Sequence, residues 1–395
     1  MKVKKYDFDR IIDRRNTNST KYDCVPWIEA NAPNDCIPMW VADMDFAAPP
    51  EVLDAMRQRL DHGIIGYTNL VSGSYRSALD AWMQKRHGWD SSGQRLVLTY
   101  GVLHAILHMI ELLSEPGDGV ILQPPIYPPF LTQITTAGRT PVYNPLLCGT
   151  DHYYTMDYDD LEKKAQDPRT KVLLLCSPHN PTGRVWQEEE LRRLAEICFA
   201  NDVKIIVDEI HHDLTRQGVR AISLAALYPN DRRIITCTAP SKTFNLAGNV
   251  SANLLFADEE LETKYYEKYM DPIPCLASIA TEAAYTYGEP WLDELRQYLD
   301  DNFHFFRQKL TECMPSVSMN TPEGTYLAWV DFRGLGLSAD EVKDRIVNKA
   351  GVIVEDGRSF LSGGEGYIRF NLACPRSIIA QAIDRITDEF TEGRK

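Results

Sequence analysis

The 395-residue sequence lacks several features that would place it in a special class of protein. It has no apolar run approaching the roughly 18 residues that cross a bilayer, and its first ten residues mix both charge signs without the apolar core of a signal peptide. Its nine cysteines are scattered and include no Cys-x-x-Cys pair, which argues against a disulfide framework or a zinc cage. These absences predict a cytoplasmic protein with reduced thiols and no membrane partner.

Basic residues are also fewer than acidic residues. The chain has 42 Lys and Arg against 56 Asp and Glu, a formal net charge of −14, which argues against a nucleic-acid partner. Hydrophobic residues make up 44% and charged residues 25%, values typical of a folded globular protein. At about 150 residues per domain, the length predicts two to three domains in one body.

Common nucleotide and metal motifs are missing or better explained by local structure. Neither G-x-S-x-G nor a Walker loop occurs, so an ordinary α/β-hydrolase or NTPase is disfavoured. Residues 334–339 fit a loose G-x-G-x-x-A pattern, but Ser338 and Glu341 predict a capping box that opens a helix over 339–350. Residues 208–213 are rich in metal-ligating types but lack the His-Glu-x-x-His spacing, so we expect no metal there.

Short β-branched runs alternate with amphipathic stretches through the first three quarters of the chain. This pattern is typical of βαβ units and predicts an α/β fold with a mostly parallel, doubly wound sheet. The expected strands are 95–99, 119–123, 171–176, 203–208, 233–238 and 251–256. Apolar spacing predicts helices over 187–200 and 289–314, the second long enough to leave the large domain.

The pattern changes after Pro315 to short strands of antiparallel type, which we expect at 325–331, 352–354 and 367–371. We therefore predict a large domain over 51–289 and a smaller α+β domain. The smaller domain would combine an interdomain helix and C-terminal part, 290–395, with the N-terminal segment 1–50. The apolar, turn-broken stretch around residues 36–50 is expected to lie against the cleft.

Four candidate ligand-binding residues lie at or just after the ends of predicted strands: Gly101, Asn180, Asp208 and Lys242. Gly101 also precedes a predicted helix. In open α/β sheets, ligands bind outside the carboxyl ends of the strands, so these groups predict one site. A helix that begins after Gly101 would bind an anion such as phosphate. A partly desolvated Lys242 suits Schiff-base chemistry, and a strand-end carboxylate can hold a protonated pyridine. A ligand with a phosphate, an aldehyde that forms a Schiff base and a protonated pyridine is pyridoxal 5′-phosphate.

Several motifs then carry a family resemblance. Ser-Pro-His-Asn-Pro-Thr-Gly at 177–183, Val-Asp-Glu-Ile-His at 207–211 and Ser-Lys-Thr-Phe-Asn-Leu-Ala-Gly at 241–248 resemble those of fold-type I, class I/II aminotransferases. More narrowly, the residues at 39–46, 66–68, 124–130 and 367–375 are similar to those of the MalY/PatB group of cystathionine β-lyases and cysteine C–S lyases. The similarity runs over nearly the whole chain, from Tyr6 onward.

The resemblance implies roles for the residues around the cofactor ring. Lys242 would form the Schiff base and later remove the substrate Cα proton, while Asp208 would pair with the pyridine N–H. Asn180 would hydrogen-bond the phenolic oxygen, and Tyr127 would stack on the ring. Broader relatives often have Tyr near the phenolic oxygen where this chain has His211, and His212 could compete for that role.

The resemblance also implies phosphate and substrate contacts. Phosphate would be bound by the backbone of Gly101, Val102 and Leu103 and by the hydroxyls of Thr238 and Ser241. Residues 243–250 lack the basic residue that many relatives place against the phosphate. Arg369 would bind the substrate α-carboxylate, with Asn180 and Tyr67 beside it. Tyr67 would reach the phosphate of a neighbouring subunit, which implies a homodimer.

For the reaction, the resemblance implies α,β-elimination of cystathionine or a cysteine S-conjugate to a thiol, pyruvate and ammonia. An amino-acid aminotransferase would use the same Lys, Asp and Asn, so it stays the alternative. A regulatory role through binding a transcription activator, with incidental lyase activity, is a further alternative from a different class of protein.

Overall fold

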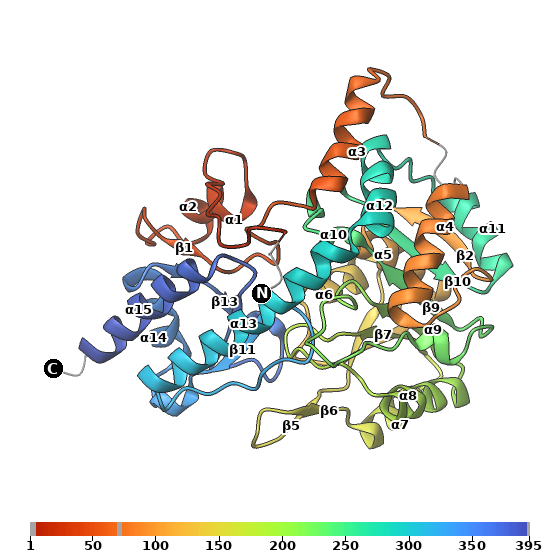
Figure 1. Ribbon diagram of the computed structural model, residues 1–395. Helices are drawn as coiled ribbons and strands as arrows, with labels where there is room; N and C mark the ends of the chain where they lie inside the picture. The colour runs from red at the N-terminus through yellow and green to blue at the C-terminus, as the bar shows by residue number, and fades with distance from the viewer. Residues whose placement is uncertain (1–4, 69–72, 393–395) are drawn as a thin grey trace.

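In the computed structural model, which describes residues 5–68 and 73–392, a seven-stranded sheet forms the centre of the large domain (Figure 1). Its order is β2-β10-β9-β8-β7-β3-β4. The strands are β2 (Arg95–Thr99), β3 (Gly119–Leu122), β4 (Thr140–Tyr143), β7 (Thr170–Cys176), β8 (Lys204–Asp208), β9 (Ile234–Thr238) and β10 (Ala252–Phe256). Only β10 runs antiparallel to its neighbours. The predicted α/β class is confirmed, and β4 is the strand of this sheet that the sequence pattern missed.

Helices cover both faces of this sheet, which explains why its inner strands are buried along nearly their whole length and are mostly apolar. Leu173 and Leu175 of β7 belong to one core, and Val172 and Leu174 to the core on the opposite face. The first core is completed by α4 (Gly73–Trp82), α8 (Glu188–Ala200) and α12 (Cys275–Tyr287), and the second by α5 (Val102–Leu113), α6 (Pro129–Thr136) and α11 (Glu259–Lys268). The sheet is thereby buried and rigid enough to position groups at its strand ends.

The long helix α13 (Glu289–Cys313) leads into the smaller domain, close to its predicted bounds of 289–314. There β11 (Leu327–Asp331), β14 (Tyr367–Asn371) and β13 (Glu355–Asp356) form an antiparallel sheet. The predicted helix over 339–350 begins as α14 (Ala339–Asp344), where the Ser338 hydroxyl accepts a hydrogen bond from the Glu341 N–H at 3.2 Å, and continues as a π-helical turn (Arg345–Lys349). The C-terminal helix is α15 (Arg376–Glu392).

One expectation for this domain was wrong. The strand β12 (Val352–Ile353) is not antiparallel but pairs in parallel with β1 (Ile37–Pro38) of the N-terminal segment. The N-terminal segment packs its Ile37 and Met39 into the core of the smaller domain, so its backbone can pair with β12. Figure 1 shows this red segment beside the blue C-terminal part.

The remaining elements are mostly short, apart from the 12-residue helix α3. They are α1 (Thr20–Asp23), α2 (Val25–Ile28), α3 (Pro50–Asp61), β5 (Leu147–Cys148), β6 (Tyr154–Thr155), α7 (Tyr158–Ala165), α9 (Leu224–Leu227) and α10 (Pro240–Thr243), with single turns at Met83–His87, Ala247–Asn249, Arg333–Leu335 and Gly357–Phe360. The outer ends of the predicted units 1–50 and 290–395, residues 1–4 and 393–395, lie outside the described residues, and the boundaries near 51 and 289 stay predictions.

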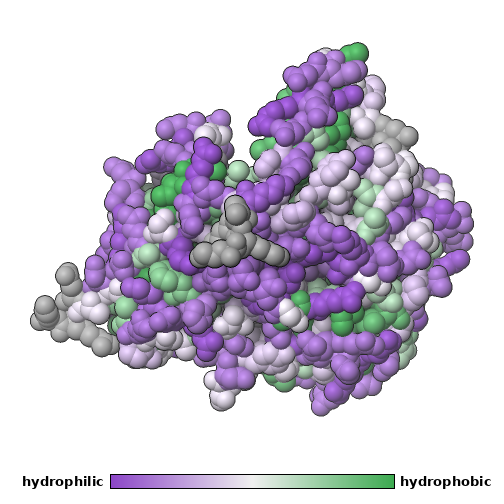
Figure 2. All heavy atoms as spheres, viewed as in Figure 1, coloured by the Kyte–Doolittle hydropathy of each residue, from purple (hydrophilic) through white to green (hydrophobic). Residues whose placement is uncertain are grey.

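The face of the molecule seen in Figure 2 is mostly hydrophilic, with hydrophobic residues gathered in small separate areas. Within the described part of the chain, none of the helices combines the length and the apolar character needed to cross a bilayer.

Candidate active site

A cavity of about 430 Å³ opens at the carboxyl ends of the central strands. Its walls come from the turn between β2 and α5, the ends of β7 and β8, the turn of α10 and the N-terminal segment. The predicted site residues that line it are Gly101, Val102, Leu103, Tyr127, Asn180, Asp208, His211, Ser241 and Lys242. The structure therefore brings together groups that are up to 141 positions apart in the sequence, from Gly101 to Lys242.

Lys242 lies on the one-turn helix α10, with its amine in the cavity. Its Nζ donates a hydrogen bond to the carbonyl oxygen of Ala42 at 2.6 Å. Burial lowers the pKa of Lys242 to about 8, against the opposing effect of the nearby Asp43 carboxylate. About a tenth of this amine is therefore neutral at pH 7, and this neutral form is nucleophilic and basic.

Asp208 is the last residue of β8 and is buried. Its Oδ1 accepts a hydrogen bond from the backbone N–H of Ile210 at 3.0 Å. Burial nevertheless raises the pKa of Asp208 to about 7, because this bond and the Lys242 amine compensate the charge only in part. A cationic ligand group placed against this carboxylate would supply the missing compensation.

His211 also lines the cavity and is buried. Burial lowers its pKa to about 3, so the imidazole is neutral. Its Nδ1 is enclosed without a hydrogen-bond partner among the described residues. The ring of Tyr326 contacts it edge-on, with centroids 5.8 Å apart. An unpaired buried nitrogen costs free energy, and a polar ligand group in the cavity would remove that cost.

Arg369 lies on β14 and approaches the cavity from the smaller domain without lining it directly. Its Nη1 donates to Oδ1 of Asn180 at 3.1 Å, and its Nη2 donates to the carbonyl oxygen of Trp40 at 2.9 Å. Oε2 of Glu355 lies 3.8 Å from Nη2. The buried Nε has no partner in the part of the chain that the structure describes, which leaves an N–H available for a carboxylate.

Gly101 forms the start of α5, where the backbone turns into the helix with φ 133°. This conformation favours glycine, and it brings the first N–H groups of a 12-residue helix to the cavity wall. Ser241 lies opposite, in α10. Thr238, by contrast, is buried behind the wall, where its hydroxyl accepts a hydrogen bond from Nδ2 of Asn253 at 3.3 Å. Its predicted phosphate contact stays a prediction.

Tyr67 does not join this cavity. Its side chain is fully exposed, next to a second cavity of about 440 Å³ between residues 65–68 and 272–276. This position is compatible with the expectation that Tyr67 serves another subunit, which stays a prediction.

Sequence reasoning missed the groups that hold Lys242 in place. The carbonyl oxygen of Ala42 accepts hydrogen bonds from both Lys242 and the Tyr326 hydroxyl, the latter at 2.7 Å. The stretch around Ala42 was expected to lie against the cleft, and Ala42 lines the cavity. A backbone carbonyl carries no side-chain signal, so its role could not be predicted. His104, which also lines the cavity, was likewise missed.

Comparisons with known proteins agree with this geometry. The profile of the family "Aminotransferase class I and II" matches residues 34–386. Cystathionine beta-lyase PatB of Bacillus subtilis is 39% identical over 96% of this chain and 98% of its own, and MalY of Escherichia coli is 32% identical over 96% and 97%.

Two solved structures are similar to this one. Cystalysin from Treponema denticola, which contains pyridoxal 5′-phosphate, has a TM-score of 0.93 at 34% identity and covers 98% of this chain and 99% of its own. The PLP-bound C–S lyase from Staphylococcus hominis has a TM-score of 0.91 at 36% identity, over 97% and 98%. These matches and the cavity lead to one conclusion: the chain belongs to the aminotransferase class I and II family.

Proposed function

We propose that this protein is a pyridoxal 5′-phosphate-dependent C–S β-lyase, which cleaves cystathionine or a cysteine S-conjugate. The observation that carries the proposal is the pair formed by Lys242 and Asp208, an amine and a carboxylate whose pKa values are both displaced toward neutrality in one cavity. The choice of lyase is supported by its relatives, since one that is 39% identical is named a cystathionine beta-lyase and two similar structures carry the cofactor.

The residues present fit the cofactor. The undercompensated Asp208 suits a pyridinium N–H, and the unpaired Nδ1 of His211 and the amide of Asn180 suit the polar edge of the ring. The start of α5 and Ser241 suit the phosphate, and Tyr127 suits the ring face. When bound, pyridoxal 5′-phosphate supplies an aldehyde that condenses with amines and a ring that withdraws electrons from Cα.

Lys242 is the base that removes the Cα proton of the substrate in this mechanism. Its amine is neutral often enough, with a pKa of about 8, to accept the Cα proton of a bound amino acid. Ala42 holds Nζ at 2.6 Å through its carbonyl oxygen, which aims the amine before the substrate arrives. Loss of the Cα proton and departure of the thiolate from Cβ release an enamine, which water hydrolyses to pyruvate and ammonia.

Arg369 and Asn180 orient the substrate. The free Nε–H of Arg369, with the adjacent Nη–H, offers a fork for the α-carboxylate, and the bond to Asn180 fixes the guanidinium plane. An oriented carboxylate presents the Cα–H bond to one face of the cavity. The same orientation would serve an aminotransferase, which the family profile keeps as the second candidate.

The test is incubation of the purified enzyme with cystathionine in the absence of any keto acid. A lyase produces homocysteine, pyruvate and ammonia in equal amounts, catalytically and without an acceptor. Turnover that begins only when 2-oxoglutarate is added would overturn the proposal in favour of transamination. A Lys242→Ala variant that keeps a cellular phenotype would favour the regulatory alternative.

We further propose a cytoplasmic homodimer. The exposed apolar residues Ile64, Ile65 and Tyr67 lie next to one another in the sequence and support a protein interface at this end of the large domain. The nine unpaired cysteines are usual in a reducing compartment. Sedimentation equilibrium at micromolar concentration tests the dimer: a monomer with full lyase activity would contradict it.

A further inference from the structure

A further cavity, of about 420 Å³, shares no lining residue with the cavity of the active site. Its wall is formed by side chains from the loop after β8, within residues 212–221, from the turn Met83–His87 and from the start of α13. Asp208 and His211, at the beginning of the same loop, line the active site instead. The two cavities therefore lie next to each other along one loop.

The wall of this cavity carries an excess of positive charge, although the formal net charge of the protein is −14. Its ionic side chains are four cations and two carboxylates, namely Lys85, Arg86, Arg220, Arg296, Asp213 and Glu289. Glu289 pairs with both Lys85 and Arg86, and Arg86 also pairs with Asp293 at 2.7 Å. Arg220 and Arg296 form no ion pair among the described residues, so their charge is left for something else to compensate.

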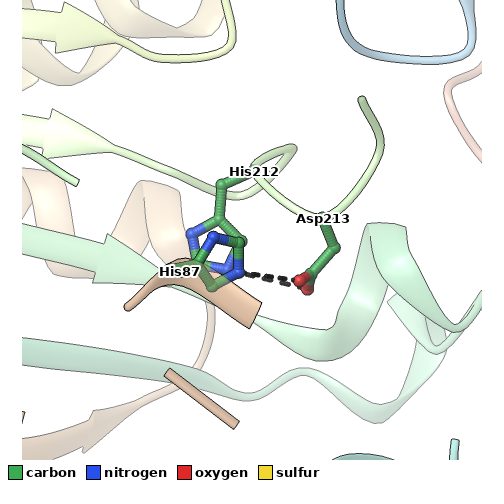
Figure 3. A group of neighbouring side chains, drawn as sticks. All are labelled: His87, His212 and Asp213. Carbon is green, nitrogen blue, oxygen red and sulfur yellow. Dashed lines mark hydrogen bonds and ion pairs between the residues drawn. The ribbon is translucent and has the colours of Figure 1, made fainter. Parts of the chain in front are cut away.

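The Asp213 carboxylate does not compensate these two arginines, because its oxygens are already occupied. Nε2 of His87 lies 2.9 Å from Oδ1, and Trp82 and Thr243 donate to the carboxylate at 3.1 and 2.9 Å. Figure 3 shows the imidazoles of His87 and His212 together beside this carboxylate, and their ring centroids are 3.8 Å apart. This part of the wall is a closed hydrogen-bonded network.

Arg296 reaches from α13 to the loop, where backbone oxygens hold it in place. Its Nε donates to the carbonyl oxygen of Thr215 at 2.8 Å, and its Nη2 donates to the Thr215 hydroxyl and to the carbonyl oxygen of Arg216, both at 3.0 Å. These bonds fix the guanidinium plane, and Nη1 has no hydrogen-bond partner in the part of the chain that the structure describes. Burial and the nearby Arg86 lower the pKa of Arg296, as expected for a cation with too little negative charge around it.

Arg220 approaches from the loop, and its guanidinium lies against the backbone of Gly88. A Cβ atom at residue 88 would collide with Nη2 of Arg220, so the guanidinium occupies the space that glycine leaves there. Gly88 directly follows His87, which places this guanidinium beside the His87 edge of the cavity. Because Arg220 makes no hydrogen bond or ion pair with the described residues, it can bind an anion without losing an existing bond.

We propose that this cavity binds a phosphate group, as inorganic phosphate or as part of a phosphorylated small molecule, between Arg220 and Arg296. A guanidinium binds phosphate through two parallel N–H groups, and two guanidinium groups from different elements suit the tetrahedral oxygens of phosphate better than a planar carboxylate. The volume of about 420 Å³ is within the range of small-molecule sites. The proposal does not rest on the lyase reaction, because the two cavities have no lining residue in common.

The test is phosphate binding by the holoenzyme, in which the cofactor already occupies the phosphate position of the active site. Isothermal titration with sodium phosphate at constant ionic strength is expected to show one site per chain. Arg220→Gln and Arg296→Gln are each expected to weaken binding about tenfold, because each removes a charged hydrogen-bond donor. Arg232→Gln, which removes an exposed arginine outside the cavity, is the matched control and should bind like the parent.

Equal phosphate affinity in the parent, Arg220→Gln and Arg296→Gln proteins would overturn the proposal. So would the absence of saturable binding to the parent below about 10 mM phosphate. Acetate that binds as tightly as phosphate would also contradict it, because the cavity would then attract any anion. Titration with glycerol 3-phosphate separates the two sources: binding tighter than that of inorganic phosphate supports a phosphorylated small molecule, and weaker binding supports the free ion.

Circular dichroism of each variant shows whether it is folded. The Arg220 side chain is exposed and makes no bond to the described residues, so Arg220→Gln keeps the test valid even if Arg296→Gln loosens the loop.

Discussion

Asp208 and Asp213 are buried carboxylates at the two ends of one short loop, and their surroundings differ. Asp213 accepts hydrogen bonds from His87, Thr243 and Trp82. Although burial raises its pKa, the neighbouring His212, followed by the bonds from His87 and Thr243, holds that pKa well below the usual range. Asp208 accepts one from the Ile210 N–H, and its pKa rises to about 7. The charge of Asp213 is well compensated within the chain, and the charge of Asp208 is compensated only in part.

This difference separates structure from function within the same loop. The Asp213 side anchors the loop to Thr243, the residue after Lys242, so it positions the catalytic turn. On the Asp208 side, the carboxylate charge is compensated only in part. Nδ1 of His211 and Nε of Arg369 also have no hydrogen-bond partner among the described residues, so a bound ligand could satisfy all three groups. We infer that the Asp213 side contributes mainly to the free energy of unfolding and that the Asp208 side contributes mainly to ligand binding.

The largest effect is expected on the ligand side. Lys242→Ala removes the amine proposed to move the Cα proton, so lyase activity should fall about 10⁴-fold or more. The free energy of unfolding should not fall, because the variant also removes a buried amine whose pKa is lowered by burial. Pyruvate release and urea denaturation measure the two quantities. Retention of a tenth of the activity would contradict the proposed role.

The next effect is expected on the structural side. Asp213→Asn breaks a buried ionic network and should lower the free energy of unfolding by about 3 kcal/mol at pH 7.5. The Asp213 contribution is present above the ordinary carboxyl pKa and is lost as pH falls, so the gap between parent and variant should shrink below roughly pH 4. Urea denaturation from roughly pH 2.5 to 7.5 measures it. A gap that is constant across this range would refute the electrostatic explanation.

The smallest effect concerns the hydroxyl that links the network to the catalytic turn. Thr243→Val keeps the shape of the side chain but removes the 2.9 Å hydrogen bond to Asp213, and should cost about 1 kcal/mol of unfolding free energy. Thr263→Val, at an exposed position of α11, is the control and should change stability by less than about 0.5 kcal/mol. Equal effects of the two substitutions would show that the Thr243 bond contributes nothing specific.

Much of the ligand side was predictable from the sequence, because its groups follow strands whose apolar runs are easy to recognise. Asp208 ends β8, Gly101 precedes α5 and Asn180 follows β7. Their convergence follows from the rule that ligands bind at the carboxyl ends of parallel strands. Most of the predicted residues around the cofactor do line one cavity.

The rest depends on contacts between distant segments that carry no local pattern. The Ala42 carbonyl reaches Lys242, and His87 reaches Asp213 from another part of the large domain. The parallel pairing of β12 with β1 was missed for the same reason, since a two-residue strand gives no indication of its partner. Buried polar networks of this kind become visible only when tertiary structure is known.

We infer that Asp208 is left only partly compensated so that it can bind the cofactor, and Asp208→Asn tests this most directly in the cofactor-free protein. A carboxyl group whose pKa is raised by folding destabilises the fold as pH rises from about 4 to 7. We therefore predict that the stability of Asp208→Asn relative to the parent increases by about 2 kcal/mol between pH 5 and pH 8, while affinity for pyridoxal 5′-phosphate falls. A stability difference that does not change with pH, or unchanged cofactor affinity, would contradict the account.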